Sequence, residues 1–210
     1  MAAITGYTTL LTTVQDYLAR SNLSTFAENF IQNWEERFYR QPKNFGSWME
    51  VTGTIGTIAS NVVVVPTRYL RLKNAYVDGN PSTRLDRKSI HQLYGRYPRG
   101  SDTDRPKEIA RDGINFVFGP PPDSTYTIKG TYYAKPVVMR LYPSDASGHW
   151  LIMNAPDLPL YGALLEAESF IKNDPRIALW QSFYTPALQD YRDLFSEEEV
   201  SGGPVQEVLG

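Results

Sequence analysis

Residues 149–195 read HWLIMNAPDLPLYGALLEAESFIKNDPRIALWQSFYTPALQDYRDLF, and this segment decides the fold of the chain. It is the densest apolar segment, and it contains two apolar runs. Each run opens with an Asp closely followed by a Pro, residues that are favoured at helix N-termini. Apolar side chains then recur at three-to-four spacing. The pattern predicts a two-helix hairpin, with one helix from Asp157 to about Lys172 and a second from Asp174 to Phe195.

Pro186 lies inside the second predicted helix. A proline at this position removes the backbone bond to the carbonyl of Ser182, and its ring crowds the same turn. We therefore expect a kink at Pro186 or a break near Thr185. The apolar stripe of this helix continues on both sides of the proline and consists of Ile177, Trp180, Tyr184, Leu188, Tyr191 and Phe195.

The identities and order of the residues in the hairpin give further information. Trp-Leu, Asn-Ala-Pro-Asp-Leu and Leu-Tyr-Gly-Ala-Leu-Leu-Glu-Ala follow one another, and then come an Asp and an Arg at a helix start and a later Trp and Tyr. In this order the segment 150–188 resembles the head-to-tail adaptor (connector) proteins of tailed phages. Outside this segment, the resemblance rests on the order of the predicted elements.

The rest of the chain alternates between helical and strand patterns. Period-two alternation, β-branched residues and short turns indicate strands, and the central strand of the later set is almost wholly apolar, which predicts that both its faces are covered. The predicted fold class is α+β, an antiparallel β-sheet or meander packed against a helical layer of N-terminal helices and the C-terminal hairpin. Along the chain we expect helices at 5–20 and 24–41, strands within 48–80, a short helix at 85–97, a meander at 109–111, 114–118 and 126–134, and then the hairpin.

Composition sets the limits of the domain organisation. The chain has 210 residues and no cysteine, which excludes disulfides, thiolate metal ligands and a cysteine nucleophile. A chain of this length can bury about 70% of its unfolded surface, so we expect one domain over residues 1–196. Residues 197–210 contain the run Glu197, Glu198, Glu199 and then Gly-Gly-Pro, and we expect a flexible tail. Without a signal-peptide pattern or the ~18 consecutive apolar residues of a membrane span, the expected protein is soluble.

Charge is distributed unevenly along the chain. Residues 68–111 contain eleven Lys and Arg against five Asp and Glu, a net charge of +6, and the remainder carries −8 because the total is −2. This basic segment is a solvated face, a contact with a negative neighbouring protein, or a contact with nucleic-acid phosphates. No helix-turn-helix, zinc or RNA-binding pattern favours the last of these.

Catalytic and metal-binding patterns are weak. His91 and His149 are far apart and lack the spacing of metal ligands, so each is interpreted as a surface or capping residue. Asp102 and Asp104 form an Asp-x-Asp pair flanked by arginines, which favours a solvated loop over a cation site. We therefore expect no enzymatic activity and no cofactor.

The resemblance implies a structural virion protein at the neck, made in the host cytoplasm. Copies would form a ring between the portal and the tail, following the portal's twelvefold symmetry, with a central channel through which DNA passes without sequence-specific binding. The free protein would be monomeric until it meets the portal. Family adaptors commonly dock a C-terminal segment on the portal, which here points to Glu197, Glu198, Glu199, Val200, Val205, Val208 and Leu209. The basic loop suggests Arg96, Arg99, Arg105 and Lys107 as contacts with a subunit or partner.

Three alternatives remain open. The first is a nucleic-acid-binding module that uses residues 68–111, and the second is another structural protein of the neck or tail. The third is a small hydrolase of cell-wall or nucleic-acid polymers, for which Asp102 is the residue to test.

Overall fold

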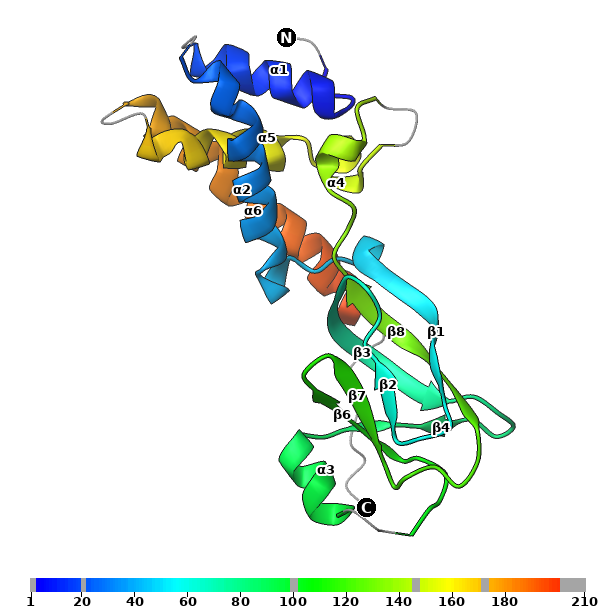
Figure 1. The fold of residues 1–210 in the computed structure, drawn as a ribbon. Coiled ribbons are helices and arrows are strands. Elements are labelled where there is room, and N and C mark those ends of the chain that lie inside the picture. Colours follow the sequence, from blue (N-terminus) through cyan, green and yellow to red (C-terminus); the bar gives the residue numbers. More distant parts are fainter. Residues whose placement is uncertain (1–2, 20–21, 99–101, 145–147, 171–173, 201–210) are drawn as a thin grey trace, which may run out of the picture. The chain divides into compact units, whose positions relative to one another are not determined.

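The computed structural model describes residues 3–19, 22–98, 102–144, 148–170 and 174–200 (Figure 1). The chain forms two compact units: a helical unit of residues 1–48 and 137–210, and a strand unit of residues 49–136. Helices and mostly antiparallel strands are segregated, so the predicted α+β class is confirmed. The single domain predicted over residues 1–196 stays a prediction.

The first two helices of the helical unit form as their apolar spacing predicts. Helix α1 (Tyr7–Leu18) buries Leu10, Val14 and Leu18, which recur every fourth residue. A short 3₁₀ turn, η1 (Ser24–Phe26), leads into α2 (Ala27–Tyr39). Helix α2 in turn buries Phe30, Ile31, Trp34 and Phe38.

The C-terminal hairpin differs in detail from its prediction. A separate short helix, α4 (Trp150–Asn154), comes before α5 (Asp157–Glu166), and α5 continues as a 3₁₀ turn, η6 (Ala167–Ser169). The predicted end at Lys172 lies outside the described residues. Helix α6 (Arg176–Val200) completes the hairpin, and α5 packs against α1, α2 and α6.

Helix α6 runs through Pro186 without interruption, so the predicted break near Thr185 is wrong. Trp180 is buried before the proline and Tyr191 is buried after it. Their burial on both sides offsets the cost of the bond that the proline removes. The helix also continues past Ser196, the predicted end of the domain, for about one further turn, to Val200.

The strand unit contains two four-stranded sheets. Strands β1 (Glu50–Ile58), β8 (Tyr126–Ala134), β3 (Tyr69–Val77) and β4 (Thr83–Arg84) form the first sheet in that order. Strands β2 (Val62–Val64), β7 (Asn115–Gly119), β6 (Glu108–Asp112) and β5 (Asp86–Arg87) form the second. All pairs are antiparallel except β5 with β6, which is parallel. The chain passes from the first sheet to the second at Leu85.

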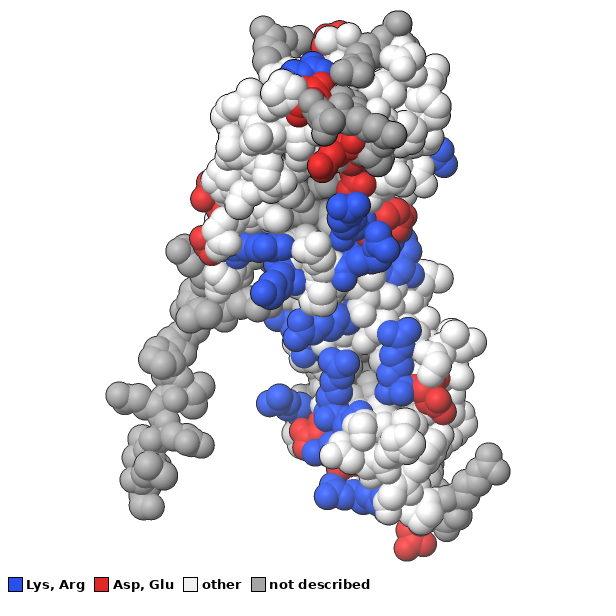
Figure 2. Space-filling view, turned by 90° about the vertical axis from the view of Figure 1, so that its left-hand side faces the viewer, with Lys and Arg blue, Asp and Glu red and all other residues white. Residues whose placement is uncertain are grey.

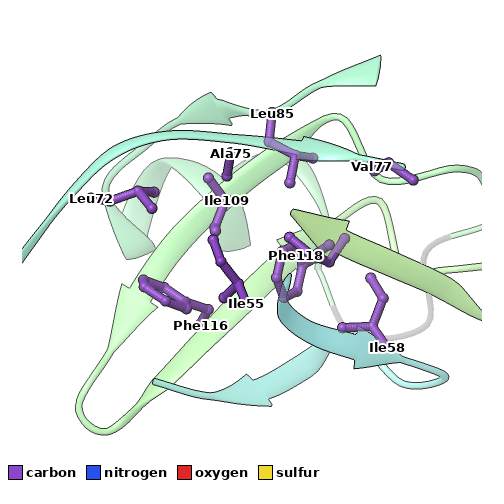
Figure 3. Packing of buried hydrophobic residues seen from close by; sticks show 10 residues of the cluster. Ile55, Ile58, Leu72, Ala75, Val77, Leu85, Ile109, Phe116 and Phe118 are labelled. Atoms are coloured by element: carbon purple, nitrogen blue, oxygen red, sulfur yellow. The ribbon is translucent and has the colours of Figure 1, made fainter. Parts of the chain in front are cut away.

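The two sheets share one apolar core. Side chains from both sheets meet there (Figure 3), and they include Ile55, Ile58, Leu72, Ala75, Val77, Leu85, Ile109, Phe116, Phe118 and Ile128. The predicted three-stranded meander is therefore wrong, because β6 and β7 form a hairpin in one sheet while β8 pairs with β1 and β3 in the other.

The short helix α3 (Ile90–Arg96) covers the opposite face of the second sheet. Ser89 caps this helix, accepting a hydrogen bond from the backbone N–H of Gln92 at 3.2 Å. Leu93 packs on Ala110 and Val117, which point away from the shared core. Strand β7 is thus covered on both faces, as its apolar sequence predicted.

Candidate contact surfaces

Of the four basic residues predicted as partner contacts, Arg96 forms an ion pair within the strand unit. Its guanidinium pairs with the carboxylate of Glu108, at the start of β6. The Glu108 side chain is only 4% exposed, whereas that of Arg96 is 63% exposed. This ion pair ties α3 to the second sheet and compensates a buried charge.

Arg105 is also engaged inside the strand unit. One guanidinium nitrogen donates to the carbonyl of Pro81 at 3.0 Å, with the carbonyls of Val77 and Asp78 at 3.5 Å. The guanidinium lies over the ring of Tyr126, 5.8 Å from its centroid. Arg105 therefore holds the turn that follows β3.

Lys107 pairs with Asp104 at 2.5 Å, and both side chains are more than half exposed. Such a solvent-screened pair adds little stability and can open for a partner. Arg99 lies outside the described residues. The partner-contact role of these four residues stays a prediction, while three of them have identified partners within the strand unit.

Aromatic side chains pack around the C-terminal part of α6 in the helical unit. The indole rings of Trp48 and Trp150 stack at 5.2 Å between centroids, and Phe195 packs on Trp150 at 5.4 Å. Tyr191 packs on Phe195 at 4.9 Å. Tyr191 and Phe195 are 5% and 7% exposed, so the aromatic cluster of Trp48, Trp150, Tyr191 and Phe195 anchors the helix immediately before residue 196.

Polar contacts reinforce this anchor. The Trp48 indole donates to the Tyr191 hydroxyl at 3.0 Å, and that hydroxyl donates to the backbone oxygen of Asn44 at 2.9 Å. Arg192 donates to the side-chain oxygens of Asn44 and Gln41, each at 2.9 Å. Burial raises the pKa of Tyr191 to about 12, so its hydroxyl stays protonated and keeps donating near neutral pH.

The predicted docking residues begin at Glu197, two residues after Phe195. Glu197, Glu198, Glu199 and Val200 continue the backbone of α6. Val205, Val208 and Leu209 lie outside the described residues. The stripe that includes Tyr191 and Phe195 was predicted from helical spacing, whereas its partners Trp48 and Trp150 were not, because they come from distant parts of the sequence.

The two histidines have different environments. His91 is exposed, as predicted. His149 occupies the N-cap position of α4 but is buried, and its Nε2 lies 3.0 Å from the Tyr39 hydroxyl. Burial lowers the pKa of His149 to about 4, so the ring is neutral near pH 7.

The described parts of the chain contain neither a metal-binding cluster nor a membrane-spanning helix. No group of three or more His, Asp and Glu side chains in these parts of the chain is arranged to hold a metal ion. The helices of these parts include none that is both long and apolar enough to cross a membrane.

The chain belongs to the SU10 adaptor protein family, whose family model matches residues 5–206. This is a family of phage head-to-tail adaptors, so the resemblance predicted from residues 150–188 is confirmed and the protein is a structural phage adaptor. No curated protein matches the chain.

Proposed function

We propose that copies of this chain form a ring between the portal and the tail of a tailed phage, with a central channel for DNA. The ring follows the portal, with twelvefold symmetry, and forms on it from monomers, since head-to-tail contacts can close a ring without a stable free oligomer. The family assignment across residues 5–206 supports the location at the neck.

The C-terminal segment 197–209 docks on the portal in this proposal. The observation that carries it is the anchored end of α6, because Tyr191 and Phe195 are buried in the aromatic cluster and the segment starts two residues after Phe195. A segment that leaves a fixed point loses less freedom on binding than one that leaves a mobile end. Its acidic start and apolar end provide both charge and hydrophobic contact.

Truncation tests the docking role. A chain that ends at Ser196 keeps the aromatic cluster, so we expect unchanged tryptophan fluorescence and thermal unfolding but no binding to purified portal. Two full-length variants separate the contributions of charge and apolar contact: Glu197, Glu198 and Glu199 all changed to Gln, and Val205, Val208 and Leu209 all changed to Ser. Portal binding that survives truncation contradicts the docking claim.

The alternative function is nucleic-acid binding by the basic segment 68–111. The charge of the strand unit favours it, with 13 Lys and Arg against 8 Asp and Glu, a net charge of +5. Binding of a labelled duplex, followed by fluorescence anisotropy, would then weaken by orders of magnitude between about 50 and 200 mM salt. An adaptor that acts only through protein contacts shows no such salt-dependent binding even at about 50 mM salt.

A further inference from the structure

The strand unit carries a cluster of arginines that is distinct from the predicted contact residues. Arg71 on β3, Arg87 on β5 and Arg111 on β6 are all exposed, and they come from both sheets. Arg111 lies over the ring of Tyr69, the first residue of β3, and the charges of Arg71 and Arg87 act on the same residue. We call Tyr69, Arg71, Arg87 and Arg111 the arginine cluster.

Strand pairing and ring contacts hold the arginine cluster together. The Arg111 guanidinium lies over the Tyr69 ring, 5.2 Å from its centroid, and the Tyr69 ring packs edge-on against Phe116 at 5.3 Å. Phe116 is the cross-strand neighbour of Arg111. Arg87 pairs with Ile109, two residues before Arg111 on β6.

The electrostatic environment of Tyr69 agrees with this geometry. Burial raises the pKa of its hydroxyl, while the backbone N–H of Leu72 and the positive charges of Arg87, Arg111 and Arg71 oppose the rise. Within the described parts of the chain, none of these three guanidinium groups pairs with a carboxylate. Three like charges therefore converge without a counterion, whereas Arg96 and Lys107 have theirs.

The charge of the whole chain indicates which anion fits. The strand unit carries +5, and the helical unit, with 8 Lys and Arg against 15 Asp and Glu, carries −7. In the lower part of Figure 2, where the strands lie, Lys and Arg side chains gather on the visible face. A chain with a net charge of −2 and a pI of about 5.7 lacks the overall basic character of a DNA-binding domain. Two units of opposite sign instead suit a repeated head-to-tail contact.

We propose that the arginine cluster binds carboxylates on the helical unit of a second copy of this chain. The inference rests on the proposed ring and names its charged subunit contact. Arginine suits this role because its planar guanidinium can bind a carboxylate through two hydrogen bonds. The helical unit offers exposed carboxylates that form no ion pair within the described residues: Asp16, Glu28, Asp157, Glu168 and Asp190.

Charge reversal tests the arginine cluster. We would compare the full-length chain with the triple variant Arg71→Glu, Arg87→Glu, Arg111→Glu by sedimentation velocity, alone and with purified portal. The triple variant should weaken association between copies by about 100-fold or more, because like charges then face each other. Arg84→Glu is the matched control, since Arg84 is an exposed arginine on β4 outside the cluster, and this variant should associate as the wild type does.

Zero-length cross-linking identifies the partner side. Arg87→Lys keeps the positive charge and supplies an amine that a carbodiimide can join to a carboxylate. In an equimolar mixture of ¹⁴N and ¹⁵N chains carrying this variant, we expect mixed-isotope cross-links from position 87 to carboxylates of the helical unit. Cross-links confined to one isotope would place the anion in the same chain and overturn the proposal.

Three other results would also overturn it. One is wild-type association of the triple variant, and another is a chain that remains monomeric at all concentrations, alone and with portal. The third is intact association with loss of affinity for a 20-base-pair duplex, which would assign the cluster to DNA. Failure of the proposed portal docking is distinguishable, because cross-linking at high chain concentration captures transient contacts between free monomers, and these contacts do not need residues 197–209.

Discussion

Gly162 in α5 provides the sharpest test of how the helical unit is packed. A Cβ atom placed on Gly162 would overlap Nε1 and Cδ1 of the Trp34 indole, which is 2% exposed. The indole cannot move freely, because its Nε1 donates to the Tyr184 hydroxyl at 3.0 Å and its ring packs on Phe38 at 5.0 Å. Even the smallest side chain at position 162 must therefore displace a fixed ring.

The expected change in the free energy of unfolding for Gly162→Ala is the sum of one stabilising and two destabilising contributions. Alanine stabilises a helix interior by about 1 kcal/mol relative to glycine. Overpacking a filled core costs about 1–3 kcal/mol, and loss of the hydrogen bond between Trp34 and Tyr184 costs about 1 kcal/mol more. The net loss in free energy of unfolding is about 1–3 kcal/mol, which lowers Tm by about 2–4 °C for each kcal/mol.

The assay compares Gly162→Ala with Gly95→Ala by differential scanning calorimetry. A Cβ at Gly95, in α3, meets no heavy atom within 4 Å, so the same substitution there should be neutral or stabilise by up to about 1 kcal/mol. Urea unfolding followed by tryptophan fluorescence adds a local measurement, because all four tryptophans lie in the helical unit. Unchanged or increased stability of Gly162→Ala would refute the described packing of α5 on α2.

Three further predictions concern stability. Burial lowers the pKa of His149 to about 4 in the folded chain, whereas an unfolded histidine titrates near 6.5. As pH drops from about 6.5 to 4, the unfolded chain takes up the proton before the folded chain does, so the free energy of unfolding should fall by about 3 kcal/mol. Urea titrations at stepped pH should show this fall in the wild type and not in His149→Gln. Arg176 donates to two backbone carbonyls at the end of α1, at 2.8 and 3.3 Å, so Arg176→Ala should cost about 1–3 kcal/mol, and equal stability in calorimetry would contradict this contact. Arg96→Ala leaves the buried carboxylate of Glu108 without this partner and should cost about 1–2 kcal/mol, with partial recovery in Arg96→Lys; a thermal midpoint that does not move would show that the ion pair is dispensable.

Local patterns predicted most of the secondary structure. The spacing of Phe30, Trp34 and Phe38 was sufficient for α2, and the apolar sequence of β7 was sufficient to predict that both its faces are covered. The continuity of α6 through Pro186 was not predictable in this way, because burial on both sides of the proline depends on other helices. Local sequence gives the cost of a proline but not the packing that offsets it.

Strand pairing, like the packing around Pro186, could not be predicted from local sequence patterns. Alternation over residues 126–134 predicted β8 correctly, but an alternating strand carries no information about its neighbours. Its pairing with β1 and β3 depends on contacts between residues more than 50 positions apart, such as Ala75 with Gly130. The same holds for His149, which sequence spacing placed at the surface or at a cap and which the fold buries.

The sequence predicted the sign of the charge on the contact surface but not which arginines form it. The net charge of residues 68–111 indicated a basic surface, and the loop arginines were its most visible members. Arg96 pairs with Glu108 and Arg105 with backbone carbonyls, whereas the arginine cluster forms no ion pair within the described residues and its Arg111 lies over the Tyr69 ring. Counting charges along the sequence does not show which of them already have partners.

The proposed place of this chain in the particle can be measured directly. Cryo-electron microscopy of the neck of whole virions, with mass spectrometry of the same sample, would locate the protein. The account predicts a ring of this chain between portal and tail, with residues 197–209 against the portal. Absence of the chain from purified particles, or a location away from the neck, would contradict it.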